Sequence, residues 1–176
     1  MRILAFAASN SSVSINQQLA TYAASLATGA EVEMLDIHDY EMPIYRHDRE
    51  EADGIPQLAR DFLAKVGEAD ALIVSFAEHN GNYTAAFKNL FDWCSRLGRE
   101  VWQGKPMLLL ATSPGGRGGR SVLDIATAAV PRFGGEVIGR LSVPSFGENF
   151  DSGAHKMLDP ELDAELRQLV TKLTIR

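Results

Sequence analysis

The sequence predicts a doubly wound α/β fold, a three-layer α/β/α sandwich around a five-stranded parallel sheet. Short apolar runs alternate along the chain with segments of helical periodicity, which is typical of repeated β–α–β units. Three of these runs are continuously apolar, as expected of strands that helices cover on both faces: 3–6, 72–74 and 107–110. By analogy with known folds, this alternation favours the sheet order 2-1-3-4-5.

Five strands are expected along the chain. They are 2–7, 31–37, 71–76, 106–112 and 136–143. A helix at 15–26 follows Ser14, and Gln17 stands three residues after that serine as in a capping box. The segment 39–54 is long, polar and without periodicity, so we expect a surface loop there.

Four more helices are expected. One at 56–66 begins with proline, which suits the first helical position. Another at 83–96 has apolar residues at helical spacing. A helix at 121–133 is less regular because Pro131 lies near its end. The last begins at Asp159, and its expected buried residues are Leu162, Leu166, Leu169 and Leu173.

Composition points to one globular domain over residues 1–176. The apolar fraction is 45%, and the formal net charge of −6 argues against a nucleic-acid partner. No apolar stretch approaches the roughly 18 residues that span a bilayer, and the apolar run after Arg2 is shorter than a signal peptide needs. The single cysteine, Cys94, excludes an internal disulfide and a multi-cysteine metal site. We expect a cytoplasmic protein with no membrane partner and no metal.

Ligands of open α/β sheets bind outside the carboxyl ends of the strands, where the winding reverses. The connections to inspect are therefore 8–14, 77–82 and 113–120.

The first connection combines four serines with asparagines just before a helix. Unpaired N–H groups and the helix dipole favour an anion there, and hydroxyl groups can donate to phosphate oxygens. It has neither the glycines and lysine of a Walker loop nor the glycines of a dinucleotide fingerprint. Alternatively, Ser14 is only a helix cap and the other serines are turn residues. The candidate residues are Ser9, Ser11, Ser14, Ile15 and Asn16.

The second connection offers donors and acceptors suited to the polar edge of a planar heterocycle. Its glycine would let a backbone N–H come close to a ligand. The alternative is a hydrophilic turn, with Asn82 as the helix cap and the histidine a surface group. The candidate residues are Ala77, Glu78, His79, Asn80 and Gly81.

The third connection has four glycines in the nine residues 112–120. Such a loop is costly in conformational entropy, so close backbone approach to a flat ring or mobility would explain it. A flexible turn without a ligand is the alternative. The candidate residues are Ser113, Gly115, Gly116 and Gly118.

Together the three connections resemble the NADPH-dependent FMN reductases, the family that includes bacterial chromate, quinone and azo reductases. The similarity is strongest over 78–83 and over 88–93, where the family has a lysine-asparagine and an aspartate-tryptophan pair. It covers roughly residues 2–143. The other matching residues are Ser9, Ser14, Asn16, Leu19, Ser113, Gly115, Gly118 and Gly119.

The resemblance implies a flavodoxin-like fold, with the phosphate of FMN at the first connection and its ring between the second and third. It implies hydride transfer from NADPH or NADH to the flavin and then two electrons to a quinone, azo dye or similar small-molecule acceptor. Catalysis would use no side-chain nucleophile or base. A homodimer or homotetramer is also implied, with residues 83–96 near an interface.

The chain departs from the family pattern at several positions. Ala8 replaces the usual glycine, Ser11 the phosphate-binding arginine, and Ala77 and His79 the proline and tyrosine of the second connection. Loss of the arginine should weaken phosphate binding, although hydroxyl and backbone donors can suffice. We interpret these changes as tuning of the site.

Two other classes of function stay open. A flavodoxin-type electron carrier would bind FMN without reacting with a nicotinamide, and a scaffold would have lost the flavin. The modest charge and the glycine-rich third connection favour the reductase. Arg117 and Arg120 are candidates for binding a 2′-phosphate. The apolar cluster 42–45 suggests that the segment 39–54 reaches a neighbouring subunit's active site.

Overall fold

The computed structural model describes residues 1–175, and its main strands form one parallel sheet in the order β2-β1-β3-β4-β5. The expected fold class and strand order are confirmed. The strands are β1 (Arg2–Ala8), β2 (Glu31–Leu35), β3 (Ala71–Phe76), β4 (Pro106–Thr112) and β5 (Glu136–Val143).

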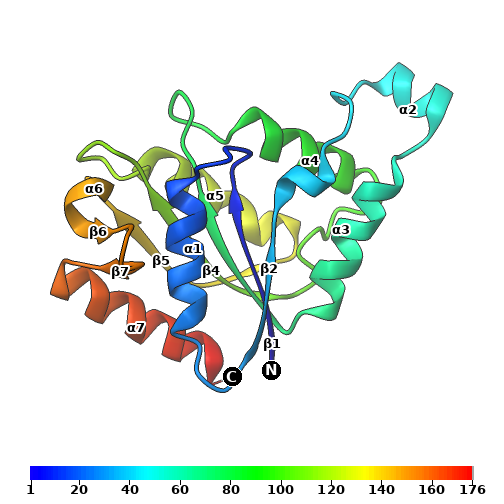
Figure 1. Cartoon of the computed structure of the whole chain (residues 1–176). Coiled ribbons are helices and arrows are strands. Elements are labelled where there is room, and N and C mark those ends of the chain that lie inside the picture. Colours follow the sequence, from blue (N-terminus) through cyan, green and yellow to red (C-terminus); the bar gives the residue numbers. More distant parts are fainter. Residues whose placement is uncertain (176) are drawn as a thin grey trace.

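Helices cover both faces of the sheet (Figure 1). On one face lie α1 (Ile15–Ser25) and α7 (Pro160–Thr174); on the other lie α3 (Gln57–Glu68), α4 (Ala85–Ser95) and α5 (Arg120–Ala129). Side chains of a strand point alternately to the two faces. In β1, Leu4 and Phe6 therefore join the core under α3–α5, whereas Ile3 and Ala5 join the core under α1 and α7.

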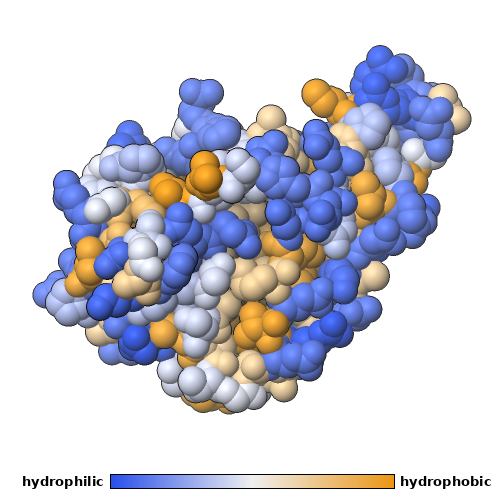
Figure 2. All heavy atoms as spheres, viewed as in Figure 1, coloured by the Kyte–Doolittle hydropathy of each residue, from blue (hydrophilic) through white to orange (hydrophobic). Residues whose placement is uncertain are grey.

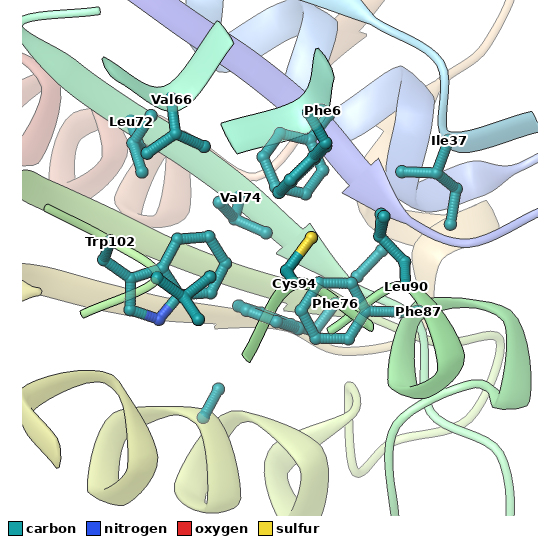
Figure 3. Packing of buried hydrophobic residues seen from close by; sticks show 14 of the residues in the cluster. Phe6, Ile37, Val66, Leu72, Val74, Phe76, Phe87, Leu90, Cys94 and Trp102 are labelled. Carbon is teal, nitrogen blue, oxygen red and sulfur yellow. The ribbon is translucent and has the colours of Figure 1, made fainter. Parts of the chain in front are cut away.

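The core under α3–α5 is rich in aromatic rings. Figure 3 shows Cys94 among Phe76, Phe87 and Leu90 in this layer. Burial raises the pKa of the Cys94 thiol to about 12, so the side chain is a packed, un-ionised group. Trp93 and Trp102 are buried within the same chain as well.

The start of α1 confirms half of the expected capping box. The Ser14 hydroxyl accepts a hydrogen bond from the Gln17 N–H at 3.1 Å. The Gln17 side chain does not return to Ser14, because its Oε1 accepts the N–H of Ala7 at 3.1 Å. It thereby ties α1 to the end of β1.

Two other helices have different bounds from those expected. The helix expected at 83–96 begins at Ala85, and its cap is Thr84, which accepts the Phe87 N–H at 3.2 Å, rather than Asn82. The helix expected at 121–133 ends as an α-helix at Ala129 and continues as the 3₁₀ helix η2 (Val130–Phe133). Pro131 lies in that tighter turn, because it has no N–H to donate.

The segment 39–54, which we expected to be a surface loop, contains helical elements. The 3₁₀ helix η1 (Ile37–Tyr40) takes up the expected end of β2, and α2 (His47–Asp53) follows. None of the residues of α2 is buried. The helix projects from the rest of the molecule, and its surface is mostly hydrophilic (Figures 1 and 2). We call residues 41–54 the arm.

The base of the arm is fastened to α4. The Trp93 indole N–H donates to the Pro43 carbonyl at 2.7 Å, and the Asn89 Oδ1 accepts the Tyr45 N–H at 2.9 Å. Glu50 accepts hydrogen bonds from the Tyr45 hydroxyl at 3.0 Å and from Arg96 Nε at 2.9 Å. These contacts explain the ordered path of a polar segment that has no hydrophobic periodicity.

The C-terminal part contains short elements that the sequence did not predict. The helix α6 (Phe146–Asn149) leads into a hairpin of β6 (Phe150–Asp151) and β7 (Lys156–Met157). In α7, Leu166 and Leu173 are buried as expected, whereas Leu162 and Leu169 are partly buried. No helix within residues 1–175 is long and apolar enough to cross a membrane.

Candidate functional site

The three connections meet at the carboxyl edge of the sheet, around an open cleft of about 280 Å³ that we call the loop cleft. The predicted site residues that line it are Ser9, Ser11, Ser14, Ile15, Asn16, Ala77, Glu78, His79 and Ser113. Sequence reasoning missed three further lining residues, Val13, Thr112 and Pro114. Asn80, Gly81, Gly115, Gly116 and Gly118 do not line this cleft.

Loop 1, residues 9–14, presents hydrogen-bond donors to the loop cleft. Its own hydroxyls shape the turn, since Ser9 Oγ accepts the Ser11 N–H at 3.3 Å and Ser14 caps α1. Within residues 1–175 no acceptor is found for the N–H groups of Ile15 and Asn16, the first two residues of α1. A helix N-terminus with free amides and neighbouring hydroxyls is suited to an anion.

The side chain of Asn16 is used inside the protein. It is buried, and its Nδ2 donates to the Thr112 carbonyl at 3.2 Å. Its Oδ1 accepts the Thr112 N–H at 3.1 Å and the Ser75 hydroxyl at 2.8 Å. Asn16 therefore fixes the first turn of α1 to the ends of β3 and β4, and can serve a ligand through its backbone N–H.

Loop 2, residues 77–82, is a tight turn. His79 and Asn82 exchange two backbone hydrogen bonds of 3.0 and 3.1 Å. The central residues Asn80 and Gly81 have φ of 52° and 74°, as a type I′ turn requires. Turn geometry thus explains the Asn-Gly pair, and the direct contact with a ring that the sequence suggested for Gly81 stays a prediction.

Glu78 joins loop 2 to the third connection. Its Oε2 accepts the N–H of Val122, the third residue of α5, at 2.9 Å. The N-cap of α5 is Gly119, which has no side chain to cap the helix. The half-buried Glu78 carboxylate supplies that cap from a neighbouring loop, at the positive end of the helix dipole. The sequence gives no signal for this contact, because 44 residues separate the partners.

Loop 3, residues 113–119, contains glycines of two kinds. A Cβ on Gly118 would lie 2.5 Å from Ser142 Oγ and 2.8 Å from the Pro144 nitrogen, so packing against the end of β5 requires this glycine. Around Gly115 and Gly116 a Cβ would meet no atom within 4 Å. These two leave open space beside the loop, and the sequence alone could not separate them from Gly118.

A histidine–aspartate pair lies at the end of β2. Asp36 Oδ1 accepts the His38 N–H and lies 2.9 Å from His38 Nδ1. The hydrogen bond to the carboxylate raises the pKa of His38, and the hydrogen bond from the His38 backbone lowers the pKa of Asp36.

Comparison with known proteins agrees with this geometry. Residues 1–146 match the family described as NADPH-dependent FMN reductase. A quinone reductase of Escherichia coli K12 is 31% identical over 134 residues, which are 70% of this chain and 71% of that protein. A 2-hydroxy-1,4-benzoquinone reductase of a Burkholderia species is 36% identical over 107 residues, 60% of this chain but only 56% of that protein.

Solved structures share the fold at lower identity. The flavoenzyme FerB of Paracoccus denitrificans, an NAD(P)H:(acceptor) oxidoreductase, has a TM-score of 0.78 at 23% identity, with 99% of this chain and 95% of that chain covered. An FMN-dependent NADH-azoreductase of Bacillus anthracis in complex with FMN has a TM-score of 0.65 at 12% identity, with coverage of 99% and 100%. The chain belongs to the NADPH-dependent FMN reductase family of flavodoxin-like oxidoreductases, flavoproteins that use FMN.

Proposed function

We propose that this protein is an NAD(P)H-dependent FMN reductase that passes two electrons to a quinone, an azo compound or a similar small molecule. The observation that carries the proposal is the loop cleft, where the hydroxyls of loop 1 and two helix amides without an acceptor in residues 1–175 meet the start of loop 2 and the start of loop 3. When bound there, FMN would supply the two-electron redox chemistry between the nicotinamide and the acceptor, and the protein would supply binding and orientation.

The residues present fit FMN, although its anchor differs from the family pattern. The amides of Ile15 and Asn16 and the hydroxyls of Ser9 and Ser11 would hold the phosphate without a cation. Loop 2 would receive the polar edge of the ring. Gly115 and Gly116 would leave its face open to a nicotinamide. Because Ser11 replaces a bidentate arginine, we expect weaker phosphate binding than an arginine gives.

The preference for NADPH or NADH depends on which residues contact the adenosine ribose, because only NADPH carries a 2′-phosphate there. Arg117 is a candidate for a 2′-phosphate, and its guanidinium donates to the Ser121 hydroxyl at 3.0 Å, which holds it beside the open side of loop 3. Arg120, at the start of α5, is exposed. Both side chains lie at the loop next to which we place the flavin ring.

We also propose that the protein acts in the cytoplasm as a homodimer or homotetramer, with no nucleic-acid partner. The arm supports an oligomer, because α2 buries no residue in its own chain and Ile44 is 76% exposed. The arm of one copy would contact a second copy near its active site. Substitution of Ile44 by aspartate puts a charge on the arm and tests this proposal.

The test of the reductase is an anaerobic absorbance titration. The protein is reconstituted with FMN, freed of excess flavin, and mixed with NADPH or NADH. Bleaching of the bound flavin by either nucleotide supports the reductase. Flavin that stays oxidised would indicate an electron carrier, and failure to retain flavin would indicate a scaffold that has lost its cofactor with the arginine.

A further inference from the structure

A cavity of about 270 Å³ lies between α4 and the end of α5 with η2, and we call it the aromatic pocket. Among the described residues, it shares no lining residue with the loop cleft. Both cavities border loop 2, because residues 77–79 line the loop cleft, whereas Phe76 and Tyr83, which flank that loop in the chain, line the aromatic pocket. The pocket is therefore a separate space beside the cleft to which we assign FMN.

The walls of the aromatic pocket are rings in contact with one another. The ring centroid of Phe91 lies 4.8 Å from that of Phe133, edge to face at 89°, and 5.7 Å from that of Trp102. The centroid of Phe87 lies 6.1 Å from that of Phe91 and 5.5 Å from that of Phe76. Because each ring is held by its neighbours, the apolar surface is formed in the protein itself and suits a flat apolar molecule.

Trp102 brings an unused hydrogen-bond donor to this apolar surface. Only 2% of the residue is exposed, yet within residues 1–175 no acceptor is found for its indole N–H. Trp93 shows the usual arrangement of a buried indole, since its N–H donates to the Pro43 carbonyl at 2.7 Å. In Figure 3 the indole nitrogen of Trp102 lies on the side of the ring turned away from Val66 and Leu72. A buried donor without a partner costs free energy, which the oxygen of a ligand would recover.

The pocket offers a second neutral donor and no net charge. Burial raises the pKa of the Tyr83 hydroxyl to about 12, so the group is protonated, and its oxygen has no hydrogen-bond partner within the described residues. Lys88 and Asp92 also line the pocket, but they pair with each other, since Lys88 Nζ lies 2.7 and 2.9 Å from the two carboxylate oxygens. These features select for a neutral molecule with hydrogen-bond-accepting oxygens.

We propose that the aromatic pocket is a second binding site, for a neutral aromatic compound with carbonyl oxygens such as a quinone. Its ring would lie against Phe87 and Phe91, and an oxygen would accept a hydrogen bond from the Trp102 N–H or the Tyr83 hydroxyl. The bound molecule would be held apart from the flavin, because the pocket and the loop cleft have different lining residues. The inference goes beyond the proposed function and does not depend on FMN.

The test measures the binding of duroquinone, the fully methylated benzoquinone, whose substituted ring carbons resist addition by thiols. No nicotinamide is present, so the probe is not reduced. The Kd is taken from ligand-observed NMR titrations that follow the methyl signal, in apo-protein and in FMN-loaded protein. Durene, the hydrocarbon with the same ring and methyl groups but no oxygens, is the matched probe for the hydrogen bond.

Two substitutions in the pocket are paired with controls that do not line it. Trp102→Phe removes the indole N–H and keeps a ring, and Trp93→Phe is the same change outside the pocket. Ala129→Trp fills the pocket from the end of α5, and Ala128→Trp adds the same bulk at the neighbouring exposed position. Circular dichroism checks that each variant folds, and light scattering gives its mass.

We expect the apo-protein to bind duroquinone and the FMN-loaded protein to bind it at least as tightly. Trp102→Phe should raise the Kd for duroquinone about fivefold, the loss of one hydrogen bond, and leave the Kd for durene within twofold. Ala129→Trp should raise the Kd for both probes at least tenfold. Trp93→Phe and Ala128→Trp should change neither Kd by more than twofold.

Three results would overturn the inference. Duroquinone binding that FMN abolishes would place the probe in the loop cleft, and unchanged binding in either Trp102→Phe or Ala129→Trp would place it elsewhere. Failure to bind duroquinone, with a lower mass for Ala129→Trp, would show that a second copy of the chain covers the pocket instead. Protein that binds duroquinone in the pocket but retains no FMN would overturn the proposed function and leave this inference standing.

Discussion

Replacing Asn16 by alanine tests whether this side chain holds the fold or the ligand. The substitution removes three hydrogen bonds, of 2.8 to 3.2 Å, to Thr112 and Ser75. Each buried polar group left without a partner costs about 1–3 kcal/mol, and the better helix propensity of alanine returns roughly 0.5 kcal/mol. If the Ser75 hydroxyl rotates to another acceptor, only the two Thr112 groups stay unpaired. We therefore expect the free energy of unfolding to fall by about 3 kcal/mol.

The assay is urea denaturation of the apo-protein followed by far-ultraviolet circular dichroism, with an unchanged m-value as the sign of unchanged native compactness. Gln57→Ala is the control, because that exposed amide donates to Asp61 and has no other side-chain partner among residues 1–175, so its loss should cost less than about 0.5 kcal/mol. An unfolding free energy of Asn16→Ala within about 1 kcal/mol of wild type would refute the reasoning. A tenfold loss of FMN affinity beside that small change would show that the side chain serves the ligand instead.

Three further predictions follow from the contacts around the site. Glu78→Ala should destabilise the apo-protein by about 1–2 kcal/mol in the same denaturation assay, because α5 loses a charge-assisted cap. Glu78→Gln keeps an acceptor and should recover at least half of the lost free energy of unfolding. Equal losses in the two variants would contradict the capping role. The His38 pKa, read by NMR titration, should lie above 6.5 and fall toward 6.5 in Asp36→Asn. The stabilisation by this pair is complete between pH 3.8 and 6.5, fades as pH rises through the raised pKa of His38, and fades in acid as pH falls through the lowered pKa of Asp36. An unshifted His38 pKa would count against the pair. Ile44→Asp should lower the mass measured by light scattering and reduce quinone turnover, without lowering the melting temperature of a monomer. Deletion of 42–45 should change mass and turnover in the same direction. Unchanged mass and kinetics in both variants would rule out an interface made by the arm.

The sheet was predictable because its signal is local. Buried parallel strands read as continuous apolar runs, and the stretches 3–6, 72–74 and 107–110 lie in β1, β3 and β4 as expected. The arm was not predictable in this way. Its order comes from hydrogen bonds between residues such as Trp93 and Pro43, and no periodicity within 39–54 reports them.

In the site, too, features with a local signal were predictable and those that depend on distant partners were not. The positions of the three loops follow from strand order, so the sequence located the loop cleft and most of its lining. The roles of single residues depend on partners far away in the chain. Asn16 and Glu78 face interior groups at Thr112 and Val122, and Gly118 is required by Ser142 and Pro144. Composition alone made all three look like ligand contacts.

The central claim is that the loop cleft binds FMN for reduction by a nicotinamide. The most direct measurement is the absorbance of FMN-reconstituted protein, without oxygen, before and after one equivalent of NADPH or NADH. The account predicts that flavin co-purifies with the protein through gel filtration and that its visible bands bleach with at least one nucleotide. Flavin that elutes free of the protein, or bound flavin that neither nucleotide bleaches, would contradict it.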